Sequence, residues 1–183
     1  MCLIPVELGS SLAGRMKLRG NCPAKVDEKG RLKIPAVFLD QLKEYGNQFY
    51  ITSTTGETAR IYPMKVWSEI EDKLEKMPST NRAKRKFLMR TSYYGQTVEL
   101  DGQGRLLLPT VLRESAQTKG DVDVLGNLDY LEVMNHARAL DQLKNEPYTD
   151  EDDKALEDLG ISGGSGEWRV ASGEQAGMRH IRR

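Results

Sequence analysis

Two arginines, 74 positions apart, stand in almost the same ten-residue phrase, and that setting suits them to bind an anionic partner. The phrases are VDEKGRLKIP at 26–35, which contains Arg31, and LDGQGRLLLP at 100–109, which contains Arg105. A guanidinium can make a paired contact with guanine O6 and N7, and it also grips phosphates. Because repetition at a fixed offset marks a structural unit, we expect two copies that place their arginines alike.

Basic residues gather around the first of these arginines. The cations of this region are Arg19, Lys25, Lys29, Arg31 and Lys33. The second phrase has Arg105 as its one cation, and Leu107 stands where the first phrase has Lys33. We infer that the first copy supplies most of a DNA-contacting face, because phosphate contacts come mainly from lysine and arginine.

A purely structural role for the two arginines stays open. Arg31 can pair with Asp27, and Arg105 with Asp101, so that each arginine braces its own turn without any ligand. The aspartates and the glycines of the two phrases are explained by the turns alone. The surplus of lysines favours DNA for Arg31, whereas both interpretations stay open for Arg105.

Residue types that carry catalysis or bind metals are scarce. The sequence has two cysteines, Cys2 and Cys22, and two histidines, His136 and His180, in no metal-ligand or disulfide spacing. It has no Ser/His/Asp set, no Cys/His pair and no phosphate-binding loop. We therefore expect no enzyme activity, no metal and no cofactor.

Composition is that of a globular protein with a charged surface, at 38% hydrophobic and 30% charged residues. The formal net charge of +0 hides separated regions, since residues 82–90 are basic and residues 150–158 are acidic. No apolar run approaches the roughly 18 residues needed to span a bilayer. The N-terminus lacks the pattern of a signal peptide, so we expect a cytoplasmic, nucleoid-associated protein.

The two phrases begin matching series of predicted elements. Each phrase supplies a strand and tight turn, followed by a second strand and a short helix that starts near a proline. A hairpin and a closing amphipathic helix complete each series. The predicted boundaries are an extension at 1–15, repeat one at 16–78, a basic linker helix at 79–97, repeat two at 98–146, and a disordered tail at 147–183.

The doubled Asp-x-x-Gly-Arg-Leu-x-x-Pro phrase, with the unit around it, resembles the MraZ family over about residues 16–146. MKLRG at 16–20 looks like the usual start of that family, so translation from Met16 is a second hypothesis. The resemblance implies an α+β fold in which two tandem AbrB-like swapped-hairpin units, with short flanking helices, form a pseudo-dimeric barrel.

The resemblance also implies a function. Members of the family are bacterial transcriptional regulators, generally repressors, that assemble into rings and bind G-rich direct repeats upstream of their own division and cell-wall gene cluster. Arg31 and Arg105 take the position of the family's DNA-contacting arginine. Arg113 follows Pro109 by four as the pattern expects, and it would pair with an aspartate of the phrase, but the first copy has Leu39 instead.

Two other classes of function remain open. One is a ring-forming scaffold that acts through protein partners with little DNA binding, which the neutral net charge favours. The other is an antitoxin-type AbrB-like regulator, although such proteins normally carry one copy per chain. Within the DNA-binding interpretation, the acidic segment from Asp150 is expected to compete with DNA for the basic face.

Overall fold

The computed structural model describes residues 17–161, in two compact units. The first extends to Asp141 and the second begins at Gln142. The expected extension at 1–15, the alternative start at Met16 and the end of the tail lie outside the described residues. Within the described range, no helix is long and apolar enough to cross a membrane.

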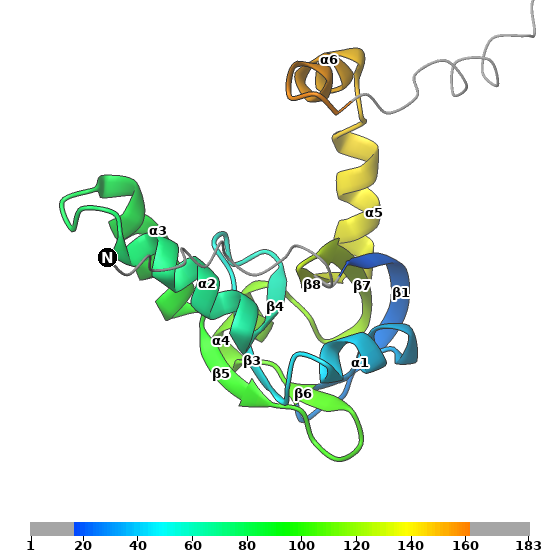
Figure 1. Ribbon diagram of the computed structural model, residues 1–183. Helices are drawn as coiled ribbons and strands as arrows, with labels where there is room; N and C mark the ends of the chain where they lie inside the picture. The colour runs from blue at the N-terminus through cyan, green and yellow to red at the C-terminus, as the bar shows by residue number, and fades with distance from the viewer. Residues whose placement is uncertain (1–16, 162–183) are drawn as a thin grey trace, which may run out of the picture. The chain divides into compact units, whose positions relative to one another are not determined.

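The first unit is built on one eight-stranded antiparallel sheet whose strand order is β5-β3-β4-β8-β7-β1-β2-β6 (Figure 1). The edge strands β5 and β6 approach each other, so the sheet forms a nearly closed barrel. The strands are β1 Leu18–Val26, β2 Arg31–Lys33, β3 Gln48–Thr52, β4 Ala59–Pro63, β5 Gln96–Glu99, β6 Arg105–Leu107, β7 Gly120–Leu128 and β8 Tyr130–Asn135.

The two repeats exchange strands within this barrel. Strand β1 of the first repeat pairs with β7 of the second, and β4 pairs with β8. Strands β2 and β6, which carry the two phrases, pair with each other around the Leu32–Leu106 pair. The hydrogen bonds that flank it are matched, from Ile34 N to Gly104 O and from Leu108 N to Gly30 O, both 2.9 Å. This pairing gives the α+β pseudo-dimeric barrel that the family resemblance implies.

The helices of the first unit follow the expected order. They are α1 Ala36–Lys43, α2 Met64–Glu75, α3 Arg82–Tyr93, α4 Thr110–Ser115 and α5 His136–Asn145, the last of which runs into the second unit. Pro35 and Pro109 precede α1 and α4, because their fixed φ suits a helix entrance and they have no amide hydrogen to satisfy. The basic linker is helical, as the sequence predicts.

The barrel core repeats with the sequence. Buried side chains are related by the 74-residue offset, among them Leu32 with Leu106, Ile34 with Leu108, and Phe38 with Leu112. Burial of each such side chain stabilises the fold by about 1.5–3 kcal/mol. The alternation of these residues with Arg31, Lys33, Arg105 and Leu107 fixes which face of β2 and β6 points outward.

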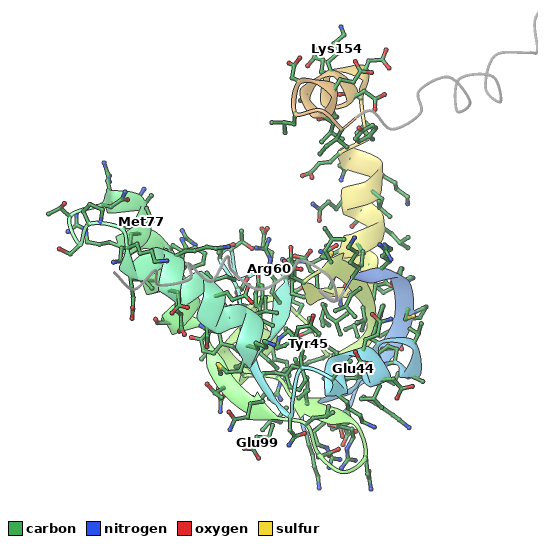
Figure 2. All side chains as sticks on the ribbon, viewed as in Figure 1. Glu44, Tyr45, Arg60, Met77, Glu99 and Lys154 are labelled. Atoms are coloured by element: carbon green, nitrogen blue, oxygen red, sulfur yellow. The ribbon has the colours of Figure 1, made fainter. Side chains whose placement is uncertain are left out.

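Helices α2 and α3 lie side by side as a hairpin, and Met77 marks its end in Figure 2. Their contact is aromatic, since Trp67 of α2 stacks on Tyr50 of β3 at 4.5 Å and lies 6.2 Å from the Phe87 ring of α3. The Asn81 side chain caps α3 by accepting from Lys84 N at 3.0 Å. The hairpin therefore presents the other face of α3, which carries most of its cations, to solvent.

The second unit contains helix α6, Asp150–Asp158, where the sequence predicts disorder. A capping box stabilises its start: Thr149 Oγ1 accepts from Asp152 N, and Asp152 Oδ2 accepts from Thr149 N at 2.8 Å. Four acidic residues in the first turn, from Asp150 to Asp153, also favour a helix, because they face the positive end of its dipole. The expectation of disorder is wrong for this segment.

Candidate nucleic-acid interface

The phrase turns, turn one at residues 27–30 and turn two at 101–104, are nearly identical. In each, the glycine amide donates to the aspartate carbonyl at 2.9 Å, and the aspartate amide donates to the arginine carbonyl at 2.9–3.0 Å. Gly30 and Gly104 have φ of +82° and +72°, a left-handed conformation that costs a residue with a side chain about 1–2 kcal/mol. The two turns therefore present their arginines in the same way.

Each arginine is locked to the aspartate of its own turn. Arg31 Nε donates to Asp27 Oδ2 at 2.7 Å and its Nη2 lies 2.6 Å from the same oxygen, while Arg105 Nε donates to Asp101 Oδ2 at 2.7 Å. The expected pairing of the structural interpretation thus occurs. This pairing leaves other N–H donors of each arginine available, because a guanidinium has five of them. The side chains of Arg31 and Arg105 are 33% and 25% exposed.

Both aspartates are held in their charged form. The hydrogen bond from the Arg31 amide is the largest effect on Asp27, and with the guanidinium it lowers the pKa below 3.8. For Asp101, burial is the largest effect and raises the pKa, but the bonds from the Arg105 side chain and amide and from the Gln103 amide together outweigh it and lower the pKa. Charged aspartates keep the arginines oriented at neutral pH.

The outer face of the β2–β6 ribbon collects residues from both copies: Arg31 faces Leu107, and Lys33 faces Arg105. The bonds from Leu108 N to Gly30 O and from Ile34 N to Gly104 O place both pairs at non-hydrogen-bonded positions, where opposed side chains are closest. Like charges directly opposite each other destabilise a sheet. The Lys33–Arg105 pair is therefore an unfavourable arrangement that an anionic ligand would relieve.

The sequence suggests that the first copy supplies most of the DNA-contacting face, but the register of β2 and β6 distributes the cations differently. Lys33 belongs to the first copy in sequence, yet it stands beside Arg105 at the end of the ribbon next to turn two. Lys29 is exposed in turn one, at the opposite end. Cations thus occupy both ends of the ribbon, and the two copies share one candidate interface.

Two of the predicted DNA-binding residues lie elsewhere. Lys25 faces outward on β1 and pairs with Asp121 of β7 at 3.4 Å, so its charge is compensated, although it is 73% exposed. Arg19 stands opposite Asn127 near the other end of β1. At about 3.3 Å per residue, it lies roughly 20 Å from Lys25 along the strand. The ribbon and turn one hold Arg31, Lys33, Arg105 and Lys29, whereas Lys25 and Arg19 lie on β1.

Arg113 does not take the expected aspartate as its partner. It extends from α4 to turn one of the other copy, where its Nη1 donates to Lys29 O at 3.3 Å. A side chain at Gly30 would collide with this guanidinium. Leu39 of α1 occupies the equivalent place over Gly104, so each turn is covered by the helix of the opposite copy. Local sequence gives no signal for this exchange, because the partners are 84 residues apart.

A second basic surface lies on α3. Lys84 and Arg90 donate to backbone carbonyls, those of Met77 and Thr54, at 2.9 and 3.1 Å. Arg82, Arg85 and Lys86 are exposed and make no ion pair within residues 17–161. Two roles are open for these three cations. They form an ordinary solvated helix face, or they make additional contacts with phosphates.

In the part of the chain that the structure describes, no group of three or more histidine, cysteine or acidic side chains could hold a metal ion. His136 Nδ1 lies 2.8 Å from the buried Asp123 carboxylate, at the start of α5, and Asn21 donates to the same carboxylate at 3.3 Å. This cluster ties α5 to the barrel and has no nucleophile.

Comparison with known proteins agrees with this architecture. The family model described as "MraZ protein, putative antitoxin-like" matches residues 18–90 and 95–158, one match for each repeat. The chain belongs to the MraZ family. Its second match includes α6, so the acidic helix is part of the MraZ repeat region rather than an appendage.

Three relatives of the chain share 77% to 99% of their own length with it. The transcriptional regulator MraZ of Acidobacterium capsulatum is 54% identical over 144 residues, which cover 78% of this chain and 99% of the relative. The protein of the same name from Koribacter versatilis is 48% identical over 145 residues, with the same coverage. That of Moorella thermoacetica is 41% identical over 114 residues, which cover 62% of this chain and 77% of the relative.

Proposed function

We propose that the protein is a sequence-specific DNA-binding transcriptional regulator. Its base-contacting surface is the outer face of the β2–β6 ribbon. The observation that carries the proposal is the juxtaposition of Lys33 and Arg105 on an exposed face that also holds Arg31. The relatives' common name, transcriptional regulator MraZ, supports the same function. The alternative, a ring-forming scaffold that acts through protein partners, has the neutral net charge in its favour.

The outward side chains of the β2–β6 ribbon have the chemistry for contacts in the major groove. A two-stranded antiparallel ribbon fits this groove, which is about 12 Å wide. Asp27 and Asp101 fix one edge of each guanidinium and leave donors free for guanine O6 and N7. Lys33 and Lys29 are unbranched cations suited to phosphates at the groove edges.

The finer proposal follows the family resemblance. It is a repressor that binds G-rich direct repeats upstream of its own division and cell-wall genes, as a ring of several copies in the cytoplasm, associated with the nucleoid. One ribbon offers few phosphate contacts, and each neutralised phosphate adds a limited amount to the affinity. A ring that presents several ribbons to repeated sites would raise the affinity through effective concentration.

The test is a fluorescence-anisotropy titration of the full chain on its own upstream DNA at several salt concentrations. We expect salt-dependent binding that Arg31→Ala weakens about tenfold to a hundredfold, the effect of losing a paired guanine contact. Thermal unfolding of the variant by circular dichroism is the check that its fold is intact.

Arg31→Lys is the matched variant. It keeps the charge but lacks the planar fork, so salt-dependent binding to unrelated DNA should persist while discrimination for the upstream site falls. A wild-type protein that assembles but binds no upstream DNA would refute the proposal and favour a ring-forming scaffold acting through protein partners.

A further inference from the structure

The two ends of the β2–β6 ribbon differ at one symmetric position. The pseudo-twofold relation superposes Arg31 on Arg105, but it superposes Lys33 on Leu107. One end of the ribbon therefore presents Lys33 beside Arg105, and the other presents Arg31 beside Leu107. A symmetric ribbon would read a palindromic site, because the symmetry of a site mirrors that of its protein. The two ends of this ribbon differ, so it is not symmetric and can bind a site that is not palindromic.

Leu107 is exposed in an unusual setting. It points outward on β6 with 49% of its surface accessible, and its neighbours Leu106 and Leu108 are buried in the core. Its cross-strand partner is Arg31, a residue that the proposed function assigns to guanine. The Cβ atoms of such a pair are about 4.5–5.5 Å apart, so the leucine faces whatever lies next to the base that Arg31 contacts.

The geometry points to Leu107 as a specificity-determining residue that contacts the 5-methyl group of a thymine adjacent to the base pair contacted by Arg31. The inference rests on the proposed function and deepens it. The thymine methyl is the apolar group that the major groove exposes, and apolar side chains recognise it. Neighbouring base pairs are 3.4 Å apart along the helix axis, within reach of two side chains that stand side by side on the ribbon.

Direction on DNA follows from the same asymmetry. At one end, the guanidinium of Arg31 donates hydrogen bonds and Leu107 beside it offers an apolar contact. This combination suits a guanine next to a thymine. At the other end, the guanidinium of Arg105 lies beside a second cation, Lys33. This combination suits a guanine next to a phosphate or a further hydrogen-bond acceptor. The ribbon then binds an asymmetric sequence in one orientation.

The experiment removes single methyl groups from the DNA. Each thymine of the upstream fragment is replaced, one at a time, by deoxyuridine, which has the same hydrogen-bonding edge without the methyl. Anisotropy titrations compare the full-length wild type with Leu107→Ala. We expect at least one position at which methyl removal weakens wild-type binding roughly fourfold, the value of one buried methyl, and has no effect on Leu107→Ala.

Two matched variants sharpen the test. Leu107→Lys makes the ribbon ends alike, so it should lose the methyl effect while its salt dependence becomes steeper. Lys33→Leu makes them alike in the opposite sense, so it should acquire a second sensitive thymine. Positions 33 and 107 are both exposed, so we expect each variant to fold and to keep the sedimentation coefficient of the wild type. The melting temperature should fall slightly in Leu107→Lys, which places a second cation opposite an arginine, and rise slightly in Lys33→Leu, which removes one.

The outcomes separate the two proposals. Tight wild-type binding without any Leu107-dependent thymine overturns this inference and leaves the proposed function standing. A change of oligomeric state in Leu107→Ala, with methyl sensitivity unchanged, also overturns it and makes Leu107 a contact between copies. Absence of wild-type binding overturns the proposed function and this inference together.

Discussion

The aspartate–arginine pairs of the two turns are best understood as positioning devices. Each aspartate binds the amide and the guanidinium of the arginine four residues later, so one side chain fixes both the turn and the direction of the arginine. An arginine held in one geometry loses less entropy when it binds a base. The structural and the DNA-binding interpretations of these arginines are therefore compatible.

The aspartates make stability depend on pH in a stated direction. The pKa of Asp27 in the folded protein is lowered from 3.8, so its contribution to the free energy of unfolding is fully present above the unfolded value and is lost as pH falls through the folded value. Asp27→Asn lacks this contribution. Its melting temperature should lie below that of the wild type at pH 7, and the difference should shrink as pH falls below about 4.

Thermal unfolding followed by circular dichroism between pH 7 and pH 3 measures this difference. Asp101→Asn is the matched variant, since the pKa of Asp101 is lowered by the same kinds of bonds. A difference between Asp27→Asn and the wild type that stays constant across this range would show that the carboxylate charge does not stabilise turn one.

At the scale of elements, the exchange of helices between the turns predicts unequal effects of two equivalent substitutions. Alanine at Gly30 or Gly104 costs about 1–2 kcal/mol for the positive φ alone. At Gly30 the added carbon also collides with the Arg113 guanidinium, whereas at Gly104 it meets Leu39 Cδ2 at 3.1 Å. Gly30→Ala should therefore displace Arg113 and lower the free energy of unfolding further.

Urea unfolding of a double-mutant cycle measures the collision. We expect Gly30→Ala to cost less in an Arg113→Ala background than in the wild type, because only the backbone strain remains. Gly104→Ala in the two backgrounds is the control and should show no such coupling. Equal costs for Gly30→Ala in both backgrounds would mean that Arg113 moves aside freely and does not brace turn one.

The elements that sequence predicts well are those specified locally. The phrase at 26–35 gives its strands, turn and helix from Gly30, Pro35 and the alternation of Leu32 with Arg31, and the structure confirms them. The pairing of Lys33 with Arg105 depends on a register between strands 72 residues apart, which no local pattern specifies. For α6, the signal was present in Thr149 and Asp152, but its apolar residues are too few to show a period.

At the scale of the whole molecule, the zero net charge is the sum of basic and acidic segments. Helix α3 has five cations and no acid, whereas α6 has six acids and one lysine. The ribbon adds further cations. For a DNA-binding protein, such a distribution steers DNA toward one surface and keeps it from another, an effect that falls with ionic strength.

The same distribution supports a competition between α6 and DNA for the basic surfaces, in one chain or between copies. A chain without residues 147–183 should then bind upstream DNA more tightly, by roughly twofold to tenfold at low salt, with the gain disappearing at high salt because screening weakens exposed charges. Anisotropy titrations at two salt concentrations measure this gain. A chain without residues 162–183 keeps α6 and is the control for the loss of that segment, which carries four arginines and two glutamates.

The effect of the acidic charges of α6 can be tested without removing the helix. Glu151→Gln, Glu157→Gln and Asp158→Asn remove three charges while Thr149 and Asp152 keep the capping box, so the helix should persist. If the acidic surface competes with DNA, this triple variant reproduces most of the gain seen in the truncated chain. If neither variant binds DNA more tightly than the full chain, α6 has another role, and its charges neither repel nor replace DNA.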